Sequence, residues 1–389
     1  QIVGAFERPL SEIAAEFGFE QAIAAQRALF DAWDILDDMY RAAALTVPVW
    51  RFTGHIGFTQ MAQLRQHCEM LALFERGGLP VAPVMVAEEP DVLEQLPEEC
   101  RKHCTAVPHA RILEVLETTE KAFIAAGGAK VGCLNSALFC EELTGYLLAS
   151  YAERFLLGEH SAVRECVVDR AGGRIYALTG RHTVTARHVV FCTNGFRSYT
   201  IRDARGNLLW DPEDDVRGIV GYMAGYQEIP RRDPTAVRYH PLMLRHHTDP
   251  YFYLTRRPYT IGPDDLSLVA IGGPEVYLLP GTPYQPQYSY DSEALAEIDD
   301  FVASTYRQPA GGTLDPAFMW HGQMGYTPGE IRWIGPDPDI PGIIYNLGCN
   351  GIGILPSIYG GKRIAEYLLT GTHEPSIFDP RPAGRGKGV

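Results

Sequence analysis

A short glycine-rich stretch near the C-terminus constrains the fold more than any other feature of the sequence. Residues 342–347 read as a buried strand, and the stretch Gly348–Gly353 (Gly-Cys-Asn-Gly-Ile-Gly) follows it directly. Apolar residues then recur at helical spacing from about Pro356 to Leu369, and Gly371 ends the pattern. A strand, a glycine-rich turn and a helix in this order bring backbone N–H groups and the positive end of the helix toward a ligand. Such turns also occur in proteins without a cofactor, so the motif alone leaves the ligand open.

The rest of the sequence alternates helical and strand patterns, which predicts an α/β fold. Apolar spacings of three and four residues predict helices over about residues 20–41, 58–75, 110–126 and 140–154. Short β-rich runs separated by glycines predict a strand meander from Ala162 to Ala186, and the apolar run 188–193 is typical of a strand buried on both faces. Between residues 211 and 320, aromatic strands separated by Pro-rich loops predict an antiparallel sheet. Its tyrosines suit a cavity wall and ordinary sheet packing equally well.

Length and charge narrow the classes of function. The chain has 389 residues, 46% of them hydrophobic, which is enough for two lobes. Lys and Arg number 34 against 48 Asp and Glu, and the resulting net charge of −14 disfavours binding to nucleic acid. No apolar stretch approaches the ~20 residues that a membrane span needs. We therefore expect a soluble globular protein with neither nucleic acid nor a membrane among its partners.

The eight cysteines show neither disulfide nor metal-site spacing. Cys100 and Cys104, with His103 and the pair His67-Cys68 nearby in the sequence, lack the second half of a zinc motif, so no metal is predicted. We interpret the stretch around His240, His246 and His247 as a polar loop and residues 381–388 as a disordered tail. Reduced thiols and the lack of a recognisable signal peptide favour a cytoplasmic protein.

Several motifs occur in a fixed order: the run Ala186–Gly195 (Ala-Arg-His-Val-Val-Phe-Cys-Thr-Asn-Gly), Trp320-His-Gly-Gln-Met-Gly-Tyr-Thr327, Ile334-Gly335, the glycine-rich stretch and Gly360-Gly-Lys-Arg-Ile-Ala-Glu366. Together they resemble the signature of the D-amino-acid oxidase-like FAD-dependent oxidoreductases, and the resemblance covers nearly the whole chain. It implies a two-lobed flavoprotein. A Rossmann-like FAD-binding lobe would comprise residues 1–50, 125–212 and 328–389, and a substrate lobe with an antiparallel sheet would comprise residues 51–124 and 213–327.

The resemblance also implies which residues hold FAD. In the family the glycine-rich loop lies under the flavin, a Val contacts the adenine, and the turn after the buried strand lies near the pyrophosphate. The corresponding positions here are Gln1, Val163, Thr193, Asn194, Gly195, Gly348, Asn350, Gly351, Ile352, Gly353 and Ile354. Some relatives bond the flavin covalently through a Cys near the position of Met324, and Met cannot form that bond, so the FAD is expected to be non-covalent.

The sequence departs from the family at its beginning. The family starts with a strand, G-x-G-x-x-G and a helix, which hold the FAD pyrophosphate, whereas this chain contains no G-x-G-x-x-G. The opening Gln1-Ile-Val-Gly4 resembles the segment that the family places after that unit. On this interpretation the chain is a fragment without its first βαβ unit, at least ~30 residues. The start at Gln1 instead of Met agrees with this interpretation.

A second departure concerns the substrate. Amino-acid oxidases of the family carry an Arg two residues after the glycine of W-x-G, where its guanidinium binds a carboxylate. Here that residue is Met324. An amine is therefore favoured over a free amino acid, although Arg256 or Arg257 could bind a carboxylate from another side. Candidate catalytic residues are Tyr253, Arg256, His321 and Tyr326, and ordinary packing or solvation explains each of them at least as well.

These features predict that the protein oxidises the C–N bond of an amine or amino-acid-like substrate. The substrate would transfer hydride to flavin N5, and molecular oxygen or another acceptor would take the electrons. The alternative hypothesis is a non-catalytic binding or scaffold protein that has lost its dinucleotide site. Turnover of an amine by the FAD-loaded protein separates the two hypotheses.

Overall fold

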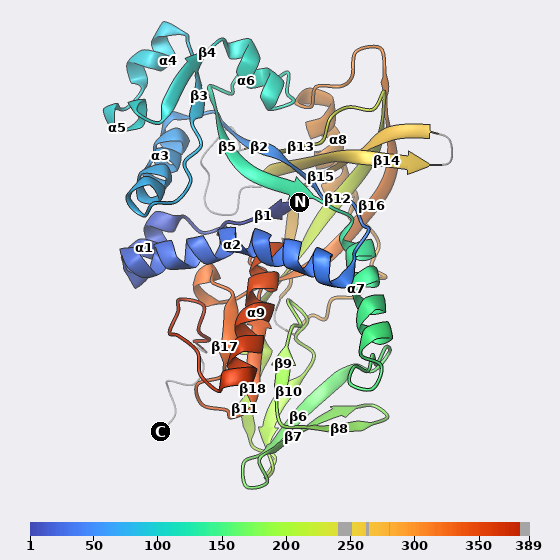
Figure 1. Cartoon of the computed structure of the whole chain (residues 1–389). Coiled ribbons are helices and arrows are strands. Elements are labelled where there is room, and N and C mark those ends of the chain that lie inside the picture. The colour runs from blue at the N-terminus through green and yellow to red at the C-terminus, as the bar shows by residue number, and fades with distance from the viewer. Residues whose placement is uncertain (240–250, 262–263, 280, 382–389) are drawn as a thin grey trace.

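The computed structural model describes residues 1–239, 251–261, 264–279 and 281–381. The polar loop expected around His240, His246 and His247 lies outside these residues, as does the expected tail after Arg381. The chain adopts the mixed α/β fold that the sequence predicts, and its described residues form one large sheet and two smaller ones (Figure 1).

The large sheet occupies the upper half of the molecule in Figure 1. Its strands are β1 (Ile2–Val3), β2 (Trp50–Phe58), β3 (Val84–Ala87), β4 (Cys104–Val107), β5 (Ala125–Cys133), β12 (Arg217–Ile229), β13 (Thr235–Tyr239), β14 (Phe252–Ile261), β15 (Asp264–Tyr277) and β16 (Thr313–Tyr326). They follow the order β16-β12-β15-β14-β13-β2-β5-β3-β4, and β1 pairs with β5. The pairs of β16, β12, β15 and β14 are all antiparallel, which confirms the sheet expected between residues 211 and 320.

Two smaller sheets form the lower half. One contains β6 (Val163–Asp169), β7 (Arg174–Thr179), β8 (Thr183–Ala186), β10 (Thr200–Asp203) and β11 (Leu208–Trp210), in the order β11-β10-β6-β7-β8. Antiparallel pairing of β6 with β7 and of β7 with β8 confirms the expected meander. The other contains β9 (Val189–Phe191), β17 (Trp333–Pro336) and β18 (Ile343–Leu347), in the order β17-β18-β9. All five residues of β18 are buried, as its apolar sequence predicts.

The helices are α1 (Leu10–Phe17), α2 (Phe19–Ala43), α3 (Met61–Arg76), α4 (Pro90–Gln95), α5 (Glu98–Arg101), α6 (His109–Val115), α7 (Ser136–Ser150), α8 (Ser292–Ser304) and α9 (Ile354–Thr370). Short 3₁₀ turns are η1 (Pro212–Asp214) and η2 (Pro328–Glu330). The helices expected over about 20–41, 58–75, 140–154 and 356–369 are confirmed as α2, α3, α7 and α9, with ends shifted by a few residues.

A shared hydrophobic core joins the N-terminal helices to the glycine-rich unit. The apolar stripe of α2 is buried along its length, and α2 lies across α9 (Figure 1). The core that contains Leu29 of α2 also contains Ile344 of β18, Ile364 of α9 and Phe58 of β2. Close packing of this kind resists relative movement of the parts it joins. The loop between β18 and α9 is therefore fixed relative to the large sheet.

A second core fixes one face of the large sheet. Side chains from its strands, such as Leu254 of β14 and Ile271 of β15, pack with Ile298 and Phe301 of α8. Leu254, Ile271 and Ile298 are fully buried. This face is therefore filled by apolar contacts, and side chains that alternate with these residues point to the other face.

The expected helix over 110–126 is wrong in its second half. Helix α6 ends at Val115, and Ala125 begins β5, which lies between β2 and β3. Helical spacing of small residues gave a misleading pattern, because β5 uses small residues for close packing in a sheet. A Cβ on Gly127 would lie 2.6 Å from Nε2 of His67 in α3, so this strand needs a glycine to let the helix approach.

The strand expected at 188–193 forms as β9, but it is not buried on both faces. Strand β9 is the outer strand of its sheet and pairs with β18. Val190 keeps 38% of its surface exposed, whereas Phe191 is buried. An apolar run without alternation cannot distinguish an edge strand from a central one.

The eight cysteines, all among the described residues, are free thiols in this structure. In the described part of the chain, no group of three or more His, Cys, Asp or Glu side chains is placed to hold a metal ion. Among the same residues, no helix combines the length and the apolar character that crossing a membrane requires.

Replacement of Leu64 tests the core under α3. Leu64 is fully buried, so Leu64→Ala removes three buried carbons and leaves a cavity. We expect the free energy of unfolding to fall by about 2–5 kcal/mol, measured by urea titration. The control is Leu369→Ala at a side chain that is 86% exposed. An equal loss of stability in both variants would contradict the assignment of Leu64 to the core.

Candidate functional site

The glycine-rich loop between β18 and α9 has an unusual backbone conformation. Gly348, Asn350 and Gly351 have φ values of +82°, +47° and +80°, in the left-handed region that glycine and asparagine tolerate best. Gly353 precedes α9 and has no side chain to cap the first turn of the helix. The N–H groups of Cys349, Asn350 and Ile352 donate within the protein, so the start of the 17-residue helix α9, with its positive end, is the part of this unit that can offer donors to a ligand.

Two asparagines fasten this loop to distant strands. The Oδ1 atom of Asn194, just after β9, accepts hydrogen bonds from the backbone N–H groups of Gly325 (3.0 Å) and Cys349 (3.1 Å). The Oδ1 atom of buried Asn350 accepts a hydrogen bond from the N–H of Thr327 (2.8 Å), and its Nδ2 donates to the Thr327 hydroxyl (3.1 Å). The end of β16 is thereby held against the glycine-rich loop.

A buried guanidinium group lies beside the loop. Arg332 donates from Nη1 to the carbonyl of Gly348 (3.1 Å) and from Nε to Oδ1 of Asn346 (2.6 Å). Its hydrogen-bond partners are neutral, and burial lowers the pKa of Arg332 to about 10. The guanidinium still carries its positive charge at neutral pH, so it places one positive charge beside the loop, in a cavity that Glu7 and Glu330 also line.

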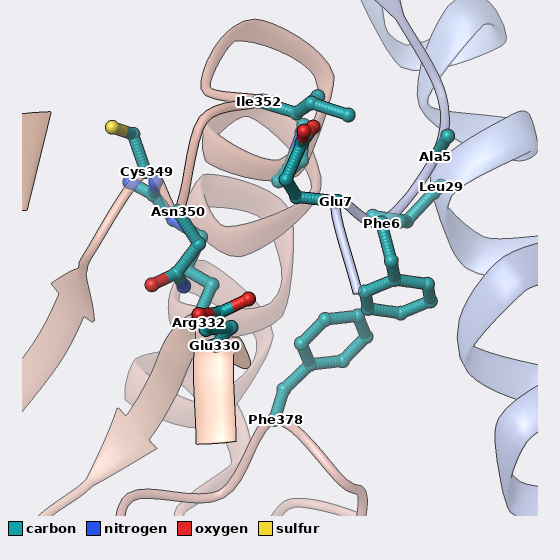
Figure 2. A pocket seen from close by; sticks show the side chains of 11 residues that line it. Ala5, Phe6, Glu7, Leu29, Glu330, Arg332, Cys349, Asn350, Ile352 and Phe378 are labelled. Atoms are coloured by element: carbon teal, nitrogen blue, oxygen red, sulfur yellow. The ribbon is translucent and has the colours of Figure 1, made fainter. Parts of the chain in front are cut away.

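The segment between β1 and α1 forms the opposite wall. Figure 2 shows Glu7 beside Ile352, with Phe6 below it, across a narrow cavity from Asn350. The ring of Phe6 stacks on Phe378 with 5.8 Å between centroids, which anchors this wall to the chain after α9. The sulfur of Cys349 points away from Glu7 and Ile352.

The face of the large sheet opposite α8 supplies the rest of the site. Residues directly opposite each other on neighbouring strands point to the same face. Arg238 of β13 is opposite Tyr253 of β14, and Tyr253 is opposite Gly272 of β15. A Cβ on Gly272 would lie 2.6 Å from the Tyr253 hydroxyl oxygen, so glycine provides the space that this side chain fills. Leu254 alternates with Tyr253 and points into the core under α8.

A β-bulge brings Glu275 to the same face. Gly272 is opposite Met223, and Glu275 is opposite Gly221, so three residue steps along β15 match two along β12. Strict alternation would point Glu275 and Gly272 to opposite faces. Because of the extra residue, Glu275 lies on the face that carries Tyr253.

Tyr326 connects this face to the glycine-rich loop. It is four residues after Gly322, which is opposite Gly221, so alternation keeps Tyr326 on the same face. A Cβ on Gly351 would lie 3.2 Å from the Tyr326 hydroxyl oxygen and 3.4 Å from Cδ of Glu7. The loop, the N-terminal segment and the sheet therefore meet at Gly351.

The charges on this face are coupled. Arg238 donates to both carboxylate oxygens of Glu7, and its guanidinium lies 3.9 Å from the ring centroid of Tyr251. Burial alone lowers the pKa of Arg238, but the Glu7 carboxylate raises it above its ordinary value. Burial, and then the negative charge of Glu7, raise the pKa of Glu275 to about 7. Burial also raises the pKa of the Tyr253 and Tyr326 hydroxyls.

Of the four candidate catalytic residues, the structure brings Tyr253 and Tyr326 together but not His321 or Arg256. His321 lies on the opposite face of β16 from Tyr326. Its Nε2 atom donates to the carbonyl of Tyr288 (2.9 Å), so Nδ1 accepts from the hydroxyl of Tyr284 (3.0 Å). Both ring nitrogens are engaged in holding the loop before α8.

Arg256 lies with the core of the large sheet. It is 3% exposed and donates to Glu117 (2.7 Å) and to the Tyr306 hydroxyl (3.3 Å). Glu228 also lies 3.7 Å from it. Arg256 therefore belongs to a buried ion-pair network on the side of the sheet that α8 covers.

The residues expected to hold FAD are placed in several parts of the molecule. Asn194, Gly195 and residues 348–354 adjoin the glycine-rich loop, and a Cβ on Gly195 would lie 2.5 Å from the Met324 carbonyl oxygen. The hydroxyl of Thr193 bonds to the Tyr199 hydroxyl (3.0 Å). Val163 begins β6 in a separate sheet and is 37% exposed, and Gln1 precedes β1.

Three charged residues of this face, Glu7, Arg238 and Glu275, were not predicted from the sequence. Arg238 had a detectable signal, because it interrupts an otherwise apolar strand, Thr-Ala-Val-Arg-Tyr. Glu275 had none, since its direction depends on a bulge. Glu7 reaches the site through a contact 231 residues away in the sequence.

With this geometry established, comparison with known proteins identifies the family. The model of the family described as FAD dependent oxidoreductase matches residues 19–367. The chain belongs to this family of FAD-dependent oxidoreductases. No curated protein matches its sequence.

Solved structures share the fold at low sequence identity. Glycine oxidase from Geobacillus kaustophilus is 14% identical with a TM-score of 0.63, covering 96% of this chain and 84% of that chain. L-Proline dehydrogenase from P. horikoshii is 14% identical with a TM-score of 0.62, covering 93% and 84%. L-α-Glycerophosphate oxidase from Mycoplasma pneumoniae, solved with FAD bound, is 12% identical with a TM-score of 0.57, covering 92% and 83%.

FAD is the cofactor of this family, and the glycine-rich loop fits a flavin. A flat ring with carbonyl groups along one edge needs close backbone approach and hydrogen-bond donors. Gly351 lacks a Cβ, so the Tyr326 hydroxyl and Glu7 come close to the loop backbone where the ring would lie, and the first turn of α9 offers donors. Arg332 adds positive charge beside them. These residues would hold the flavin.

Substitution of Gly351 tests this assignment. Val at this position would clash with Tyr326 and Glu7 and would disfavour the left-handed backbone, so we expect Gly351→Val to abolish FAD binding. The measurement is the FAD-to-protein ratio from visible absorbance after reconstitution. Gly361→Ala is the control, because a Cβ there meets no atom within 4 Å. Full occupancy by FAD in the folded Gly351→Val protein would contradict the assignment.

Proposed function

We propose that the protein oxidises the C–N bond of a small amine with non-covalently bound FAD, giving an imine that water hydrolyses. The observation that carries the proposal is the meeting of the glycine-rich loop and the polar sheet face at Gly351, where the Tyr326 hydroxyl lies. A substrate on that face lies next to the loop that we assign to the flavin. Molecular oxygen or another acceptor would then take the electrons.

Bound FAD would accept two electrons and a hydrogen from the substrate carbon. The side chains on the sheet face have the tasks of binding the amine, removing its proton and orienting it. Glu275 is suited to hold or release a proton near neutral pH, because burial raises its pKa to about 7. Tyr253 and Tyr326 keep their protons at that pH, since burial raises the pKa of both, so each can donate a hydrogen bond.

The positions of the cationic side chains near this face favour an amine substrate over an amino acid. Met324 stands where related amino-acid oxidases carry their carboxylate-binding Arg. Both terminal nitrogens of Arg238 bond to Glu7, and Arg256 is buried on the α8 side. Arg257, on the same face of β14 as Tyr253, donates to the carbonyl of Pro258 and lies over the ring of Tyr259. A substrate carboxylate would have to displace Glu7 to pair with Arg238.

The direct test is reduction of the flavin by amines. The protein reconstituted with FAD is mixed without oxygen with primary and secondary alkylamines, and the oxidised flavin absorbance is followed. We expect absorbance to be lost with at least one amine, and hydrogen peroxide to form in air if oxygen is the acceptor. Full absorbance with every amine would favour the non-catalytic alternative.

Tyr326 provides a second test. Tyr326→Phe removes one hydrogen bond donated toward the substrate, a loss of about 1.5 kcal/mol, so flavin reduction by the amine should slow about tenfold. FAD occupancy should not change. Tyr284→Phe is the matched control, because Tyr284 bonds to His321 on the other face. Equal rates for the wild type and Tyr326→Phe would exclude this role.

A further inference from the structure

Two neighbouring glycines, Gly221 and Gly322, lie on the sheet face beside Glu275, and we call them the glycine floor. Gly322 of β16 is opposite Gly221 of β12, which is opposite Glu275 of β15, so the three form one row across three strands. A Cβ on Gly322 would meet no atom within 4 Å, and one on Gly221 would meet only the Met324 side chain, at 3.0 Å. There is thus open space over Gly322, the Met324 side chain lies over Gly221, and a carboxylate stands at one end of the row.

The sides of this floor are apolar. Gly322 lies between Trp320 and Met324 on the same face of β16, because residues two apart in a strand point the same way. Trp320 is 41% exposed. Opposite residues in an antiparallel sheet are about 5 Å apart, so the row from Gly322 to Glu275 spans about 10 Å. The space fits a thin aliphatic chain.

The negative charge of Glu275, at the end of the row, has no cationic side chain of its own as a partner among the described residues. Glu275 faces Glu7 from the N-terminal segment, Arg238 from β13 and the hydroxyls of Tyr251, Tyr253 and Tyr326. Arg238 is already paired with Glu7. Of the charged groups that act on Glu275, Glu7 and Arg238 neutralise each other, so ionised Glu275 is an excess negative charge at this end of the row, and a cation is the ligand that would balance it.

We infer that Gly221, Gly322 and Glu275 form the binding pocket for an aliphatic amine in its cationic form that carries no carboxylate. Glu275 binds the ammonium group, and the alkyl chain lies over the glycines between Trp320 and Met324. This inference rests on the proposed amine oxidation and names its substrate class. Glu275 is then the residue that selects for charge, and Gly322 is the residue that limits the width of the chain.

Binding and reduction are measured separately on the FAD-loaded protein. Calorimetry gives the Kd of propylamine and of 3-aminopropanoate, which has the same chain with a carboxylate added. We expect propylamine to bind at least tenfold more tightly. The Kd of propylamine should fall as the pH rises through about 7, where Glu275 ionises, and Glu275→Gln should raise it 10-fold to 100-fold and remove this pH dependence.

Gly322→Leu tests whether the ligand lies over the glycine floor. Because a side chain there enters open space, we expect the variant to fold and to keep its FAD, yet to bind propylamine at least tenfold more weakly. Gly145→Leu on the exposed surface of α7 is the matched control and should bind like the wild type.

The outcomes distinguish the two proposals. Tighter binding of 3-aminopropanoate than of propylamine, or an unchanged Kd in both Glu275→Gln and Gly322→Leu, would overturn the pocket. Binding as expected without any flavin reduction would support the pocket and overturn the amine oxidation. Reduction by propylamine with an unchanged Kd in both variants would support the oxidation and place the substrate elsewhere.

Discussion

The site depends on two asparagine side chains that tie the glycine-rich loop to the strands around it. Asn194 accepts from Gly325 and Cys349, and Asn350 bonds to Thr327 through both its oxygen and its nitrogen. Each asparagine has a positive φ, which costs roughly 1–2 kcal/mol for a residue with a side chain. Hydrogen bonds of about 1 kcal/mol each offset that cost. The same bonds fix the end of β16, so the loop and Tyr326 are positioned together.

The bulge in β15 is the second constraint, and it determines what the site can bind. It points Glu275 to the face that carries Tyr253, where regular pairing would point it into the apolar core under α8. Glycine at positions 221, 272 and 322 leaves room on that face for a tyrosine and for a ligand. Backbone irregularity and missing side chains thus create the polar recess.

The elements of the fold that could be predicted from the sequence are those that depend on interactions between residues close together in the chain. Helices α2, α7 and α9 and the meander of β6, β7 and β8 have local signals, and these were predicted. The fold class and FAD followed from motifs that the family shares. By contrast, β5 was mistaken for helix because its small residues reflect packing against α3.

The candidate site residues were also hard to predict, because their placement depends on contacts that are distant in the sequence. Alternation places Tyr253 and Arg256 on opposite faces of β14, and Tyr326 and His321 on opposite faces of β16. The sequence alone does not reveal which face is covered by α8, so all four were equal candidates. The pairing of Glu7 with Arg238 joins segments 231 residues apart and has no local pattern.

The charges of the site differ between its two sides, and this difference bears on the reaction. Arg332 is surrounded by neutral carbonyl groups, so the loop side favours an electron-rich group. On the sheet side Glu7 neutralises Arg238, and Glu275 adds negative charge once it ionises. A cationic amine is attracted to the sheet side, while electron density gained by a group at the loop is stabilised by Arg332. The bound ammonium must lose its proton, for which ionised Glu275 is suited, before its carbon can release hydride, and the positive charge of Arg332 would then stabilise the electron density at the loop.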